Sequence, residues 1–171
     1  MKWPGILIVT ALLITAGTLL LYSGYYNVAA TQAHWRTTLR IINEVRELSI
    51  AFHSRNIKPP PMESPGLLET GLRRYHESCR VCHGAPSFPR DDFAKGLYPN
   101  PPDLAAGDVQ EMSNSQIFWV LKHGIKMTGM PAFGSTYDDD ELWGIVGFIR
   151  SLPGMKPDQY RKPLEAVESK G

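Results

Sequence analysis

The first clear pattern along the chain is a long apolar segment near the N-terminus. No charged side chain occurs between residues 3 and 33, and residues 6–21 are almost wholly apolar. With its flanks this stretch has about 19 residues, close to the roughly 20 that cross a bilayer as a helix. Three tyrosines follow it at positions typical of an interfacial aromatic belt, namely Tyr22, Tyr25 and Tyr26. The pattern predicts a membrane anchor over residues 1–26.

A cleaved signal peptide is the competing interpretation of this segment. Such peptides carry a shorter apolar region, of about 7–15 residues, that ends at small residues. Val28, Ala29 and Ala30 match a cleavage site only weakly, so the sequence favours an uncleaved anchor. Lys2 before the span favours a cytoplasmic N-terminus.

A second helical pattern lies in residues 27–61. Four apolar side chains recur there at helical spacing, and most charged side chains lie elsewhere: Ile41, Val45, Leu48 and Phe52. Lys58 and three prolines after it end the pattern and start a stiff link. We expect a helical stalk followed by a proline-rich linker; if its helix continues from the membrane, it covers residues 27–56. Its apolar stripe either packs on the C-terminal domain or docks on another membrane subunit.

Residues 62–155 read as an all-α domain with no alternating strand pattern. One helix begins at Ser64 or Pro65 and ends before Gly84, and a second covers residues 115–123. A last helix is capped by Thr136 or Asp138 and ends at Pro153. Its apolar face is made of Leu142, Ile145, Val146 and Ile149. A proline- and glycine-rich loop joins the first two helices, and residues 156–171 remain as a C-terminal tail.

Candidate chemistry enters with the only two cysteines, which lie in the run Cys79-Arg80-Val81-Cys82-His83. Cys-x-x-Cys-His is the attachment signature of a c-type haem. The thiols, about one helical turn apart, add to the two vinyl groups of a porphyrin, and His83 reaches the iron from one face. A zinc site or a redox-active thiol pair are the alternatives, although neither has its usual sequence context.

The second axial position of a haem iron requires another ligand. Methionine opposite histidine is the arrangement of cytochromes c. Met130 lies between Gly129 and Pro131, in a segment whose composition fixes a loop without regular hydrogen bonding. We therefore predict Met130 as the distal ligand, with Met127 and His123 as alternatives. Trp119, Phe133 and Trp143 are candidate haem-pocket residues.

From Pro65 to Pro153 the chain resembles the class I cytochromes c. The resemblance rests on a glycine and a tyrosine spaced before the cysteines, on Met130-Pro131-x-Phe133 and on the last helix. It implies one covalent haem c and a domain located outside the cytoplasmic membrane, in the periplasm. Pro102 matches the proline whose carbonyl accepts the proximal histidine's proton. A ligating imidazole needs such a partner to fix its tautomer.

The charge distribution argues against some classes of function. The chain totals +1, with six basic and two acidic side chains in residues 1–61 (+4), which leaves −3 for the remainder. This balance argues against nucleic-acid binding. No catalytic constellation is evident, so the sequence predicts a single-electron carrier and not an enzyme, with redox proteins of membrane complexes as partners. A haem-based ligand sensor or a peroxidase-like enzyme, in which the distal methionine dissociates, is the alternative.

Overall fold

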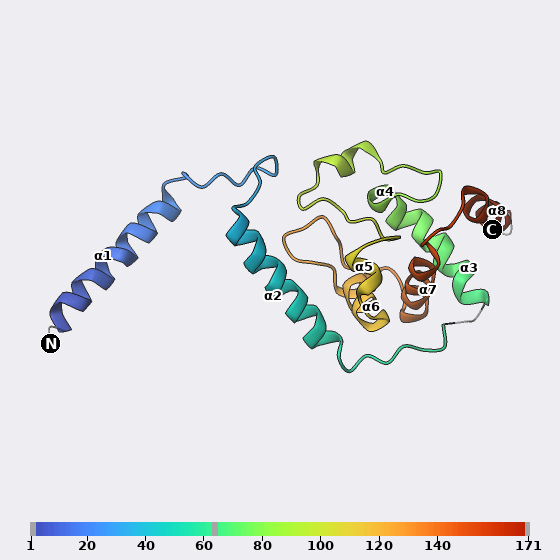
Figure 1. Cartoon of the computed structure of the whole chain (residues 1–171), viewed down its shortest axis with the longest axis horizontal. Coiled ribbons are helices and arrows are strands. Elements are labelled where there is room, and N and C mark those ends of the chain that lie inside the picture. Colours follow the sequence, from blue (N-terminus) through green and yellow to red (C-terminus); the bar gives the residue numbers. More distant parts are fainter. Residues whose placement is uncertain (1–2, 63–64, 170–171) are drawn as a thin grey trace. The chain divides into compact units, whose positions relative to one another are not determined.

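The computed structural model describes residues 3–62 and 65–169, and the regular elements in this part of the chain are all helices (Figure 1). The predicted all-α class is therefore confirmed. The chain divides into two compact units, one up to His34 and one from Trp35 onward. Lys2 and the proposed helix start at Ser64 lie outside the described residues.

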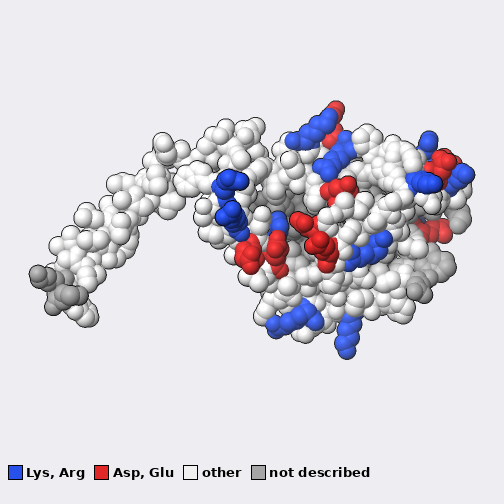
Figure 2. Space-filling view, in the orientation of Figure 1, with Lys and Arg blue, Asp and Glu red and all other residues white. Residues whose placement is uncertain are grey.

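Helix α1 (Trp3–Tyr22) occupies the predicted apolar segment. It has 20 residues, and its most apolar 18-residue window has a mean hydropathy of 2.2. No charged side chain interrupts it (Figure 2), and none of its residues is buried. By length and composition, α1 is able to cross a membrane.

The stalk helix α2 (Arg36–Ser54) is shorter than expected and does not continue from α1. In the segment between α1 and α2, polar side chains form hydrogen bonds with backbone groups that a continuous helix would use itself. The Ser23 hydroxyl donates to the Leu20 carbonyl, and the Asn27 side chain accepts from the Ala29 amide at 2.9 Å. Gly24 adopts a positive φ of 70°. Such local bonds and conformations end a helix, so the condition of one continuous helix is not met and α1 and α2 are separate helices.

One face of α2 packs against α6 (Asn114–His123) within the second unit. Ile50 and Ser54 of α2 are 6% and 3% exposed. The Ser115 hydroxyl of α6 donates to the carbonyl of Ile57, just beyond α2, at 2.8 Å. The predicted apolar stripe lies on another face and remains 56–61% exposed: Ile41, Val45, Leu48 and Phe52. The stalk thus packs on the C-terminal domain, but not through the face that the sequence indicated.

The haem-motif helix consists of three successive segments. These are α3 (Pro65–Arg74), a π-helical turn η1 (Tyr75–Cys79) and α4 (Arg80–His83). The Arg80 amide donates to the Tyr75 carbonyl, which closes the wide turn. π-Turns of this kind are frequently found at functional sites. Gly84 ends the helix at φ 76°, and its carbonyl accepts a 2.7 Å hydrogen bond from the buried Tyr75 hydroxyl.

Helix α7 (Asp139–Ser151) crosses α3 at the centre of the domain (Figure 1). Its residues from Leu142 to Ile149 are all buried. A Cβ on Gly71 would lie 2.0 Å from the Gly144 carbonyl oxygen, so the two helices meet backbone to backbone. Asp138 and Glu141 form the capping box that begins α7. The Arg74 guanidinium binds Glu141 and Glu77, which raises its pKa and fastens α3 to α7.

Short helices interrupt the long loop that follows the haem motif, namely η2 (Asp92–Gly96) and α5 (Asp108–Glu111). A third short element, η3 (Phe133–Ser135), follows the predicted methionine loop. Arg150 of α7 makes hydrogen bonds to the segment from α5 to the start of α6. It donates to the Gln110 carbonyl at 2.8 Å, to the Asn114 side chain at 2.7 Å and to the Met112 carbonyl.

The C-terminal segment differs from the sequence expectation of a tail, because residues 157–168 form helix α8 (Pro157–Glu168). Tyr160 and Leu164, one turn apart, are 0% and 6% exposed and belong to the core. The Tyr160 hydroxyl shares a 2.9 Å hydrogen bond with Nδ1 of His76. Pro157 at the first turn and the i, i+4 apolar pair are signals that could have identified this helix.

Replacing Tyr160 by phenylalanine should lower the free energy of unfolding by about 1 kcal/mol at neutral pH, because the bond to His76 is lost. Burial raises the pKa of Tyr160. The folded chain therefore keeps a proton that the unfolded chain releases near pH 10, and wild-type stability falls above that pH. Urea titrations followed by circular dichroism at pH 7 and above pH 10 should show a shallower decline for Tyr160→Phe. Tyr25→Phe, at a site 84% exposed, should have the stability of the wild type at both pH values. If the stability of Tyr160→Phe fell with pH as much as that of the wild type, the prediction would be contradicted.

Candidate functional site

The two cysteines of the motif lie on consecutive helical segments and are unpaired thiols. Cys79 ends η1 and is 4% exposed, whereas Cys82 in α4 is half-buried. Burial raises the pKa of Cys79 to about 12 and also raises that of Cys82. A redox-active thiol pair usually has a lowered pKa, so this environment does not favour the thioredoxin-like alternative. It suits thiols that are consumed in covalent bonds.

His83 follows directly, at the C-terminal end of α4, with its ring held in one orientation. Its Nδ1 donates a 2.8 Å hydrogen bond to the carbonyl oxygen of Pro102. Because a carbonyl only accepts, the proton is on Nδ1 and the lone pair of Nε2 is free to bind a metal. Burial lowers the pKa of His83, which favours the neutral, ligating form. Pro102, expected as the partner of this histidine, thus lies in hydrogen-bond contact with it.

The loop that carries Met130 is anchored at the end of α6. Gly124 has φ 67°, and a Cβ there would lie 2.7–2.8 Å from backbone atoms of residues 130–132. The loop therefore folds back directly onto the helix end, and a side chain at position 124 would displace it. The Ile125 amide donates to the Met130 carbonyl at 3.2 Å. Thr128 donates to the Ile125 carbonyl at 2.8 Å and accepts from the Met130 amide at 3.1 Å.

The three candidate distal ligands differ in how far their side chains are buried. Met130 is partly buried and packs against the core that includes Cys79. Met127 is 95% exposed and has φ 58°, so its thioether points into solvent. His123 is exposed at the end of α6 and lies against the ring of Trp119. Among the three, Met130 is the donor that the fold directs toward the core.

Trp119 and Phe133 occupy different surroundings. The Trp119 ring stacks on His53 of α2, with centroids 5.6 Å apart and planes at 14°. Phe133 is partly buried against the core and stacks on Tyr137 at 5.8 Å. Their assignment to a haem pocket remains a prediction. Trp143 stacks on Phe118 at 4.2 Å in the core, as an ordinary packing residue would.

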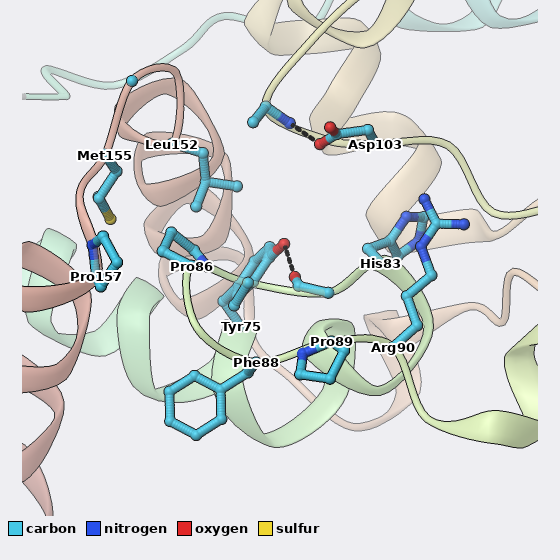
Figure 3. A pocket seen from close by; sticks show the side chains of 14 residues that line it. Tyr75, His83, Pro86, Phe88, Pro89, Arg90, Asp103, Leu152, Met155 and Pro157 are labelled. Carbon is cyan, nitrogen blue, oxygen red and sulfur yellow. Dashed lines mark hydrogen bonds between the residues drawn. The ribbon is translucent and has the colours of Figure 1, made fainter.

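A cavity of about 500 Å³ lies beside His83 (Figure 3). Its wall includes Tyr75, Phe88 and Arg90, and Leu152 and Met155 lie on the side opposite His83 and Arg90. Cys79, Cys82 and Met130 are not among its lining residues, so this cavity adjoins the cysteine–histidine site without constituting it. Within the described ranges, no three His, Cys, Asp or Glu side chains gather in a way that could hold a metal ion.

Three features fit a covalent haem: a thiol pair on one helix, an imidazole with its Nε2 lone pair free, and a half-buried thioether on a pinned loop. In an all-helical domain this is the arrangement expected of a c-type cytochrome. Residues 66–149 match the family model described as cytochrome c oxidase, cbb3-type, subunit III, which is consistent with a monohaem c-type cytochrome. No curated protein matches the chain.

The hydroxyl of Thr128 should be important for the position of the methionine loop. Thr128→Val keeps the shape of the side chain but removes both hydrogen bonds, at a cost of about 1 kcal/mol in the stability of the loop. We expect the haem-loaded variant to bind added imidazole or cyanide several-fold more tightly than the wild type in optical titrations. Thr136→Val removes a hydroxyl that makes no hydrogen bond within the described part of the chain. Equal affinities in both variants would exclude this role for Thr128.

Proposed function

We propose that the protein transfers single electrons through one haem c. Thioether bonds from Cys79 and Cys82 would hold the haem, with His83 and Met130 as axial ligands. The bound group supplies an iron that changes its oxidation state by one electron. The observation that carries the proposal is the hydrogen bond from His83 Nδ1 to Pro102, which prepares Nε2 for a metal directly after the cysteine pair.

The proposal also gives roles to Pro102, Phe133 and Trp119. Pro102 would fix the tautomer and raise the basicity of His83. Phe133, next to the methionine loop, and Trp119, on α6, would restrict solvent near the cofactor, since an apolar surrounding raises the potential of a haem. With both axial positions filled by side chains, no open coordination site is left for a substrate. This favours a carrier over an enzyme.

The sensor or peroxidase-like alternative requires a polar side chain beside the iron. Its two candidates are His123 and Lys126, and both are exposed. The positions of these residues therefore favour electron transfer.

We further propose that α1 anchors the chain in the cytoplasmic membrane and that the haem domain lies on its outer, periplasmic side. The donor and the acceptor would be redox proteins in membrane complexes of a respiratory or photosynthetic chain, with the protein as a carrier or a subunit. The charge supports this weakly, since the span is uncharged and positive charge precedes it at Lys2.

The proposal is tested on the full chain, produced in a host that attaches haem to c-type cytochromes. Mass spectrometry should find one haem added to the wild type and none added to the Cys79→Ala, Cys82→Ala variant. The oxidised protein should be low-spin and six-coordinate, with the weak near-infrared band of sulfur–iron ligation. Absence of added haem mass would refute the proposal, and a high-spin ferric form that binds carbon monoxide readily on reduction would support the sensor or enzyme.

A further inference from the structure

Helix α2 has two faces that carry apolar side chains, and the cytochrome domain covers only one. The covered face includes the buried Ile50 and Ser54, and α2 packs against α6. The other face carries five large apolar side chains that are 46–61% exposed: Ile41, Ile42, Val45, Leu48 and Phe52. We call these five residues the α2 stripe. We propose that the α2 stripe docks into the surface of the lipid bilayer that α1 enters, an inference that rests on the proposed membrane anchor.

The α2 stripe is unlike the rest of the second unit. From residue 36 onward, the other exposed large apolar side chains in the described chain are Leu68, Phe93 and Met127, which lie on three separate segments. Single exposed apolar residues are normal on a soluble surface, but a contiguous apolar face marks an interaction site. The α2 stripe is therefore a surface that needs a partner.

The charges around the α2 stripe favour lipid as that partner. Residues 36–58 carry five basic side chains and two acidic ones. Arg46 binds one of the acids, Glu47, at 3.4 Å. The Arg55 guanidinium lies 3.8 Å from the ring centroid of Phe52, so a positive charge borders the stripe. A helix with an apolar face and arginines beside it is typical of helices that lie in the interface of anionic membranes.

The position of α2 in the chain supports the same partner. Only residues 23–35 separate α1 from α2, so a bilayer crossed by α1 is the apolar phase nearest along the chain. Trp35 immediately precedes α2 and is 80% exposed, and Tyr25 in the connecting segment is 84% exposed. Tryptophan and tyrosine are enriched at the level of lipid headgroups. Because α2 is also packed on α6, docking of the stripe would hold the cytochrome domain at the membrane surface.

Site-directed spin labelling of the full, haem-loaded chain tests this proposal. Both native cysteines would be consumed by haem attachment, so an introduced cysteine is the only site of labelling, and the unmodified chain should take up no label. Val45→Cys reports on the α2 stripe. Glu47→Cys, two residues away, is the matched control, with a side chain 66% exposed. Leu12→Cys in α1 reports separately on the anchor.

The labelled chains are reconstituted in vesicles of phosphatidylglycerol and phosphatidylcholine, and collisions with oxygen and with a water-soluble nickel complex are measured. We expect the label at position 45 to favour oxygen several-fold over that at position 47, as a label in lipid does. The preference should weaken in pure phosphatidylcholine or at high salt, because the arginines then lose their attraction to the headgroups.

Three results would overturn the docking. A water-exposed label at position 45 together with a lipid-exposed label at position 12 would leave the anchor intact and refute the docking alone. Spin–spin broadening at position 45 that disappears on dilution with unlabelled chain would identify a second copy as the occupant. Water exposure at both positions 45 and 12 would refute the anchor as well.

Discussion

Replacing Met130 by alanine should leave the haem attached but lower its reduction potential by roughly 0.1 V or more, since axial ligands set haem potentials over a wide range. Loss of the thioether removes a ligand that favours the reduced iron. The loop itself should persist, because Gly124, Ile125 and Thr128 anchor it through backbone and hydroxyl contacts. Potentiometric titration followed optically gives the potential, and added cyanide or imidazole reports the opened coordination site.

Met127→Ala is the matched control for this experiment. It lies on the same loop, three residues earlier, but its side chain is 95% exposed. The potential and spectrum of Met127→Ala should equal those of the wild type. If Met127→Ala instead changed both while Met130→Ala left both unaltered, the ligand assignment would be wrong. If neither variant had an effect, His123→Ala would be the next variant to measure.

The second large effect is expected at the crossing of α3 and α7. In Gly71→Ala the new methyl group would lie 2.0 Å from the Gly144 carbonyl oxygen and 2.4 Å from its carbon. Both obstacles are backbone atoms, so the helices must separate. Overpacking of this kind typically costs 1–3 kcal/mol and occasionally more, and we expect a loss of about 3 kcal/mol in the free energy of unfolding. Denaturant titration of the haem-loaded chain measures it.

Gly66→Ala provides a control in the same helix. A Cβ at Gly66 meets nothing within 4 Å, and alanine is up to about 1 kcal/mol more favourable than glycine inside a helix. Gly66→Ala should therefore be as stable as the wild type or slightly more stable. If the two variants had equal stabilities, the close crossing of α3 and α7 would not be a constraint on the fold.

Local signals predicted most of the cytochrome domain. The helix predicted over residues 115–123 differs from α6 by one residue. Asp138, one of the two caps predicted for the last helix, forms the capping box of α7, because capping depends on neighbours in the sequence. The partner of His83 also lies where the resemblance placed it, at Pro102.

The failures concern contacts that a sequence pattern does not specify. The spacing of Ile41, Val45, Leu48 and Phe52 showed that α2 has an apolar face, but the domain covers a different face built partly from Ser54. A serine gives no hydrophobic signal, so the sequence pattern did not predict which face of α2 packs on the domain. The break between α1 and α2 depends on side-chain bonds to the backbone at Ser23 and Asn27. Helix α8 is too polar outside Tyr160 and Leu164 to stand out.

The packing of α2 on the domain has a consequence for how far electrons can be carried. If the whole stretch from residue 27 to residue 61 were a flexible tether, the cofactor could move far from its anchor. With α2 packed on α6, the link between α1 and α2 comprises only the thirteen residues 23–35, whose fully extended length is about 45 Å. If α1 is the membrane anchor that we propose, this short link would keep the domain close to the membrane, so donor and acceptor would have to meet it there.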